Sequence, residues 1–177
     1  MSVNVSMIKV GPAGGQWGTD WDEKGKGEIA KIFVSDSEYK ICSLQFLFVE
    51  NGRFVLSDKH GSATTSKYFN TVALDFPSEF LTSISGFYGS SELTSITFVT
   101  NKHTYGPYGA MAPSSTCEEF IFQLGVDRCF GGFHGTKYSN HIESIGVYVK
   151  TLTRSMITPT NSQVRVTRRV AVKREEV

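Results

Sequence analysis

Short runs in which apolar and polar residues alternate dominate the chain. Residues 43–49 place three apolar side chains on one face, and the run stops at Asn51-Gly52. Alternation with a period of two is typical of a β-strand with one buried face, and Asn-Gly is a strong signal for a tight hairpin turn. The sequence therefore predicts a hairpin that returns through residues 53–56.

Similar runs recur along the chain, and Gly, Asp, Ser or Pro residues separate them. No window shows a sustained helical period with a cap at each end. Many short strands at a spacing of roughly 8–12 residues are typical of an all-β sandwich, barrel or prism, and alternation alone leaves these three architectures open. Further strands are expected at residues 29–34, 71–76, 81–85, 93–100, 119–124 and 142–150.

Composition says more about where the protein works and what it binds than about its fold. The chain has 177 residues, which is enough for one domain, and its net charge of +1 implies no general attraction to nucleic acid or membrane. No apolar stretch approaches the roughly 20 residues of a membrane span. The odd set Cys42, Cys117 and Cys129 argues against a disulfide framework. We therefore expect a protein of the cytoplasm and nucleus, not a secreted one.

The character of the chain changes near Lys150. Residues 151–177 contain no aromatic residue and no glycine, and they carry six Lys and Arg residues against two Glu residues. We divide the chain into an N-terminal arm (1–6), a globular domain (7–150) and a charged C-terminal tail (151–177). The tail is expected to be disordered or to form a marginal extra strand. Because it lacks aromatic residues that stack on bases, protein partners are favoured over nucleic acid.

Three blocks of sequence, in this order, resemble jacalin-related lectins. Gly11 to Gly15 reads Gly-Pro-Ala-Gly-Gly and precedes Trp21-Asp22. Residues 104–109 read Thr-Tyr-Gly-Pro-Tyr-Gly, and the last block joins residues 131–135 (Gly-Gly-Phe-His-Gly) to Ile-Gly-Val-Tyr-Val at 145–149. The resemblance covers residues 7–150. It implies an all-β fold, the β-prism I of three four-stranded Greek-key sheets with pseudo-threefold symmetry.

Two segments narrow the resemblance. Residues 54–61 and 131–136 are similar to a branch of short plant jacalin proteins that is associated with resistance to viruses, including restriction of long-distance potyvirus movement. Members of this branch tend to carry a tail after the domain. The resemblance therefore implies a role in antiviral defence and a viral or host protein as a partner of the tail.

The resemblance also places a carbohydrate site at one end of the prism. In jacalin-type lectins a Gly-x-x-x-Asp segment supplies the carboxylate that accepts hydrogen bonds from sugar hydroxyls. A Gly-rich N-terminal loop adds backbone donors, and an aromatic residue after Ser-Gly flanks the ring. Carried over to this chain, the candidate carbohydrate-binding residues are Gly14, Gly15, Phe87, Asn140, His141, Ile142 and Glu143.

Both defining residues of the segment differ here, because Ser139 stands at the Gly position and Glu143 at the Asp position. Glu keeps the carboxylate but moves it by one methylene. A millimolar sugar site holds only about 4 kcal/mol, and one hydrogen bond to a charged group contributes about 1.5–3 kcal/mol. Losing one bond would therefore remove much of the affinity. The sequence leaves Glu143 either as a ligand carboxylate or as a solvated acid at a strand edge.

The resemblance and the two altered residues leave two functions open. The first is a lectin of mannose or glucose type that acts in defence, since residues 11–15 lie inside a continuous chain, whereas galactose-binding members are cleaved there. The second is a protein-interaction module with a degraded sugar site. Either protein could form homo-oligomers, as jacalin-like domains often do.

No enzymatic activity, metal or cofactor is expected. The sequence contains no nucleophile elbow and no HExxH sequence. The four histidines show no metal-ligand spacing with the cysteines and are expected in loops or on the surface.

Overall fold

The structure is a computed structural model, and it describes residues 6–151. Residues 1–5 of the predicted arm and residues 152–177 of the predicted tail lie outside the described residues. Within 6–151 the chain forms β-strands and no helix. The strands are β1 (Met7–Gly14), β2 (Thr19–Asp22), β3 (Ile29–Asp36), β4 (Ile41–Glu50), β5 (Arg53–Leu56), β6 (His60–Gly61), β7 (Tyr68–Ala73), β8 (Leu81–Tyr88), β9 (Leu93–Thr100), β10 (Thr104–Gly109), β11 (Glu118–Gln123), β12 (Phe130–Lys137) and β13 (Ser144–Lys150).

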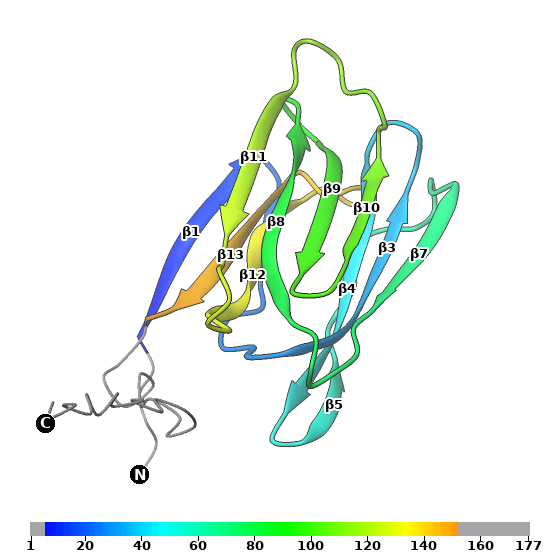
Figure 1. The fold of residues 1–177 in the computed structure, drawn as a ribbon. Helices are drawn as coiled ribbons and strands as arrows, with labels where there is room; N and C mark the ends of the chain where they lie inside the picture. Colours follow the sequence, from blue (N-terminus) through cyan, green and yellow to red (C-terminus); the bar gives the residue numbers. More distant parts are fainter. Residues whose placement is uncertain (1–5, 152–177) are drawn as a thin grey trace, which may run out of the picture.

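Three antiparallel sheets surround a common interior (Figure 1). Their strand orders are β1-β13-β12-β2, β10-β9-β8-β11 and β5-β4-β3-β7. We call them the first, second and third sheet. Strand β6 adds to the third sheet, and it pairs with the same edge of β4 as β5 does, nearer the start of β4. The two short strands together act as one interrupted strand, so the predicted all-β prism with three four-stranded sheets is confirmed.

The hairpin between β4 and β5 forms where the sequence predicts it. Asn51 and Gly52 both have positive φ, at 50° and 74°. Two consecutive positive φ values match the twist of a two-residue hairpin, and Asn and Gly are the residues that adopt them most readily. Val49 then pairs with Phe54 across the turn.

One predicted strand is shifted. The run at residues 71–76 was expected to be a strand, but β7 covers Tyr68–Ala73 and a turn follows it. The amide of Glu79 donates to the carbonyl of Asp75 in that turn, at 2.8 Å. Pro77 lies inside the turn and has no amide hydrogen to give to a ladder, so the alternation of residues 74–76 is not used in a sheet.

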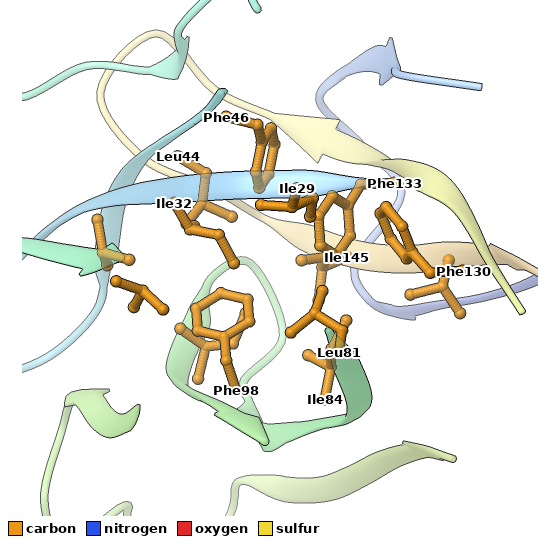
Figure 2. Close-up of a cluster of buried hydrophobic side chains, with 14 of the residues drawn as sticks. Ile29, Ile32, Leu44, Phe46, Leu81, Ile84, Phe98, Phe130, Phe133 and Ile145 are labelled. Carbon is orange, nitrogen blue, oxygen red and sulfur yellow. The ribbon is translucent and has the colours of Figure 1, made fainter. Parts of the chain in front are cut away.

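Side chains from all three sheets meet in one core (Figure 2). Phe46 of the third sheet stacks on Phe133 of the first, with ring centroids 4.5 Å apart. Phe98 of the second sheet is also fully buried. Burying aromatic side chains of this size removes large apolar areas from water, which is the main stabilising contribution to a fold of this kind. The core therefore fixes the three sheets relative to one another.

Strand direction decides which loops share an end of the prism. In Figure 1, β1 and β8 point toward the same end. The loop that follows β1 therefore lies at that end, and the segment that precedes β8 lies at the opposite one. This arrangement separates two buried carboxylates, Glu143 and Glu79.

Candidate functional site

Three loops meet at the end of the prism where β1 finishes. They are residues 15–18 after β1, residues 89–92 between β8 and β9, and residues 138–143 between β12 and β13. A Cβ atom on Gly15 would lie 2.5 Å from Glu143 Oε1 and 2.7 Å from the carbonyl oxygen of Ser90. Contacts this short show that the loops touch at Gly15 and that a side chain there would force them apart.

Glu143 lies at the centre of this meeting point. Its exposed fraction is 0%. Its Oε1 accepts a hydrogen bond from the amide of Trp17 at 3.0 Å, and its Oε2 accepts one from the amide of Gly18 at 2.7 Å. A carboxylate needs such donors when it leaves water, because an unpaired buried charge is strongly unfavourable. The side chain therefore points inward and ties residues 17 and 18 to the strand that follows the last loop.

Other groups reinforce this attachment. Thr136 Oγ1 donates to the carbonyl of Gly15 at 2.9 Å and lies 2.6 Å from Ser144 Oγ. Gly14 has a φ of +119°, and a Cβ atom there would lie 2.5 Å from the carbonyl oxygen of Glu143. Only glycine combines that dihedral with that approach. The Gly-rich loop is thus held at several points along its length.

In the segment at residues 139–142, three side chains lie at the surface and one lies in the core. Ser139 is exposed, and Asn140 and His141 are partly exposed. His141 Nε2 donates to the carbonyl of Ser91 at 2.9 Å, which joins this loop to the one between β8 and β9. Ile142 is fully buried in the hydrophobic core, so its side chain serves packing.

Of the predicted site residues, Gly14, Gly15 and Glu143 come into contact with one another, and Asn140 and His141 lie in the adjoining loop. Phe87 lies on β8, where it pairs with Ser95 and Glu119. The residue of that hairpin that reaches Gly15 is Ser90. Hollows of about 250 Å³ and about 790 Å³ in the described surface are lined by other segments.

Sequence reasoning missed the residues that hold Glu143. Trp17 and Gly18 contribute backbone amides, and any residue other than proline has one, so residue type carried no signal. Trp17 as a whole is 84% exposed although its amide is held by Glu143. The available signal was the spacing of Gly14, Gly15 and Gly18, which indicates a loop in which backbone approaches other groups closely.

The expectation for the histidines was wrong at two positions. His60 and His134 are buried. His60 stacks on Trp21 with centroids 4.4 Å apart and hydrogen-bonds to Glu23 through Nε2, and His134 Nε2 donates to the carbonyl of Val10 at 2.9 Å. Burial lowers the pKa of both imidazoles. A neutral ring that has a hydrogen-bond partner is readily accommodated in a core, and spacing in the sequence does not reveal such a partner.

Cys42 is buried, as its position in an apolar strand predicts, and all three cysteines are free thiols. Among residues 6–151, no group of three or more His, Cys, Asp or Glu side chains is placed to hold a metal ion. The same residues include no helix that is long and apolar enough to cross a membrane.

Comparison with known proteins identifies the family. The model of the jacalin-like lectin domain matches residues 10–148. The chain is 38% identical over 154 residues to Protein RESTRICTED TEV MOVEMENT 1 of Arabidopsis thaliana, which covers 81% of this chain and 87% of that protein. It is 36% identical over 159 residues to Jacalin-related lectin 2 of the same plant, with coverage of 81% and 86%.

Solved structures agree with this result. The artocarpin–mannotriose complex superposes with a TM-score of 0.69 at 31% identity and covers 82% of this chain and 98% of that one. A mannose-specific jacalin-related lectin from Morus nigra, in complex with mannose, gives a TM-score of 0.71 at 28% identity, with coverage of 85% and 99%. With the matched framework and the three-sheet fold together, the chain belongs to the jacalin-related lectin family and has its carbohydrate-binding lectin fold.

Proposed function

We propose that this protein acts in plant defence through contacts with other proteins, and that its inherited sugar site is closed. One observation carries the proposal: Glu143, at the position of the family's sugar-binding Asp, is fully buried and gives both of its oxygens to backbone amides of its own chain. A carboxylate in this state does not face an incoming hydroxyl.

The free energies involved support a closed sugar site. To reach a sugar, Glu143 would have to release the amides of Trp17 and Gly18. Each hydrogen bond to a charged group contributes about 1.5–3 kcal/mol, and a millimolar monosaccharide complex is worth only about 4 kcal/mol in total. Opening the loop would therefore cancel most of the binding free energy.

The defence role is supported by the relatives. A protein with 38% identity over 87% of its length is named for restricted movement of a virus. We propose the same kind of role for this chain, in the cytoplasm and nucleus, where its free thiols would stay reduced. Partners are viral or host proteins, and the charged tail at residues 151–177 is proposed as one of the contact regions.

Titration calorimetry with mannose, glucose, galactose and a high-mannose glycan tests the closed site. The wild type is expected to give no binding heat at millimolar sugar. The double variant Ser139→Gly/Glu143→Asp restores the family's residues, and the shorter Asp cannot reach both amides. It is expected to gain millimolar mannose binding. The Ser139→Gly single variant is the matched control and should give no binding heat.

A second candidate is a working lectin of mannose or glucose type. The observation that favours it is that the three loops of the family's sugar-binding end still converge, with Asn140 and His141 partly exposed. Two of the similar structures are mannose or mannotriose complexes. This candidate requires heat from the wild type, stronger for mannose than for galactose, and that result would overturn the closed site.

The defence role is tested in susceptible plants that express the protein. Virus spread to distant leaves is expected to be restricted by the wild type and by the Ser139→Gly/Glu143→Asp variant alike. Deletion of residues 152–177 is expected to weaken restriction. If the site variant abolished restriction while the deletion had no effect, the proposal of protein contacts would be wrong.

A further inference from the structure

The outer face of the third sheet is apolar. Residues directly opposite one another in a sheet share a face, and neighbours along a strand alternate. Ile32 pairs with Phe46 and Val72, and all three are fully buried. The residues on either side of these positions therefore point outward. Ser35 and Ser43 also point outward but are buried. The rest of the outward set, which we call the apolar outer face, is Lys31, Phe33, Gln45, Leu47, Val49, Phe54, Leu56, Phe69, Thr71 and Ala73.

Several of these side chains lie in water. Phe69 on β7 is 71% exposed, Phe54 on β5 is 68% exposed, and Leu56 beside it is 56% exposed. Phe33, Leu47 and Val49 between them are partly exposed. Single exposed apolar residues are ordinary, but a contiguous set across one sheet marks a surface that is covered in use.

The outer faces of the other two sheets are different. On the second sheet, Ser85 pairs with Thr97 and Ile121, and only Ile121 of the outward apolar residues is largely exposed. Phe87 and Val99 on the same side are partly exposed. On the first sheet, the ring of Tyr148 is buried, and the ammonium groups of Lys9 and Lys24 lie 6.0 and 5.6 Å from its centroid. The third sheet therefore differs by degree: its outer face has three largely exposed apolar side chains, whereas that of the second sheet has Ile121.

A hollow of about 250 Å³ is cut into this face. Phe33, Gln45 and Phe69 contribute to its lining, and so does Lys59 from the segment between β5 and β6. The hydroxyls of Ser35 and Ser43 hydrogen-bond to each other within it. A hollow with an aromatic side chain, an amide, hydroxyls and a cation in its lining can accept an apolar side chain and its polar neighbours from another protein. A flat or protruding apolar face would suit a lipid surface better.

The charges on the face select the partner. Lys31 lies on the face and Lys59 lines the hollow, neither forms an ion pair within the described residues, and no carboxylate belongs to the set. Glu50 at the end of β4 lies on the opposite side by alternation and pairs with Lys26. A second copy of this face would oppose lysine to lysine, and the basic tail would do the same, so both are disfavoured.

We propose that the apolar outer face binds an amphipathic segment of another protein, with apolar side chains on Phe54, Phe69 and the hollow and with carboxylates on Lys31 and Lys59. This inference rests on the proposed function, because it names the surface through which protein contacts are made. The sugar-binding end of the prism takes no part in it.

A displayed library of random 12-residue peptides, selected on the full chain, supplies the probe. The selected peptides are synthesised and their dissociation constants measured by fluorescence anisotropy. They are expected to combine aromatic or aliphatic residues with Asp or Glu. The Phe54→Ser/Phe69→Ser variant should raise the dissociation constant at least tenfold. The Lys59→Glu variant should bind acidic peptides more weakly and keep the fold of the wild type. Ile121 on the second sheet is an apolar residue that is also more than half exposed, so the Ile121→Ser variant is the control and should bind as the wild type does.

Three results would overturn the inference. The first is selected peptides that lack acids or that bind the Phe54→Ser/Phe69→Ser variant unchanged. The second is a wild type that binds no peptide but sediments with phosphatidylserine vesicles, while the Phe54→Ser/Phe69→Ser variant does not sediment with them. The third is a concentration-dependent dimer that the same variant disrupts. Sugar titrations separate this inference from the proposed function. If the wild type binds neither sugar nor the selected peptides, the docking surface is wrong and the closed sugar site stands. If the wild type binds both mannose and the peptides, the closed sugar site is wrong and the docking surface stands.

Discussion

Two buried glutamates lie at opposite ends of the prism, and they are held differently. Glu79, in the turn before β8, is 2% exposed and accepts hydrogen bonds from the amide of Asp75, Thr100 Oγ1, His103 Nδ1 and Tyr105 OH. Glu143 is buried at least as deeply but accepts only two hydrogen bonds from the described residues 6–151, both from backbone amides. The first therefore joins side chains from several strands, and the second fixes one loop.

The difference shows what each carboxylate does. Four donors and an exposed fraction of 2% leave Glu79 inaccessible to a ligand, and the residue joins the turn after β7 to the turn between β9 and β10. Glu143 stands where the family places its sugar acceptor, and two donors are enough to turn it inward. Under the proposed closure, one added methylene and a loop that supplies amides are what turn the carboxylate at this position into a structural group.

Glutamine at each position is the sharpest test of this comparison. Glu79→Gln places an amide NH₂ among four donors, so at least one buried donor loses its acceptor. We expect a loss of about 3 kcal/mol or more in the free energy of unfolding, and only about 1–2 kcal/mol for Glu143→Gln. Urea unfolding at neutral pH measures both. Equal losses would show that donor number does not distinguish the two sites.

Acid should weaken the contacts that Glu79 makes. Burial raises the pKa of Glu79, but the hydrogen bonds from Asp75, Thr100, His103 and Tyr105 outweigh it and lower the pKa from 4.5 to about 2. A depressed folded-state pKa gives stability that is present above 4.5 and is lost as the pH falls toward 2. At about 1.4 kcal/mol per pKa unit, roughly 3 kcal/mol depends on this group.

The measurement is the difference in unfolding free energy between wild type and Glu79→Gln at pH 7, 4 and 3. Taking the difference removes the contributions of His60 and Asp36, whose pKa values burial also shifts. We expect the difference to shrink as the pH falls. Glu79→Gln should lack this acid loss and Glu143→Gln should keep it, and a difference that stays constant with pH would contradict the account.

Gly15→Ala should affect the loop end alone. A Cβ atom there would lie 2.5 Å from Glu143 Oε1 and 2.7 Å from the carbonyl of Ser90. Overpacking of this kind usually destabilises by about 1–3 kcal/mol. We expect the amide protons of Trp17 and Gly18 to exchange faster with solvent while those near Glu79 do not change. Unchanged exchange at Trp17 would mean that the loop has room to move.

The smallest effect on stability is expected at the apolar outer face. Phe69→Ser removes a side chain that is mostly in water, so the free energy of unfolding should change by no more than about 0.5 kcal/mol. The melting temperature measured by calorimetry checks this. A large loss would show that Phe69 supports the fold, and its exposure would then say nothing about a partner.

Local pattern predicted much of the fold and failed where backbone geometry rather than side chains forms the strand. Alternation located β3, β4, β5 and β9, and Asn51-Gly52 located the turn. It gave no strand at β12, whose Gly-Gly-Phe-His-Gly run has too few side chains to show a period. The resemblance supplied the three-sheet arrangement, since alternation does not say which strands pair.

The sequence by itself determined the family, because the framework blocks that carry the resemblance depend on residue identity along the chain. It also predicted which residues would form the sugar-binding end, including Glu143 at the Asp position. Only the tertiary structure decided that the carboxylate of Glu143 turns inward. Its donors are amides about 125 residues away, and amides leave no mark on residue type. The apolar outer face also emerged only there, because it is assembled from four strands of which each shows just two or three outward side chains.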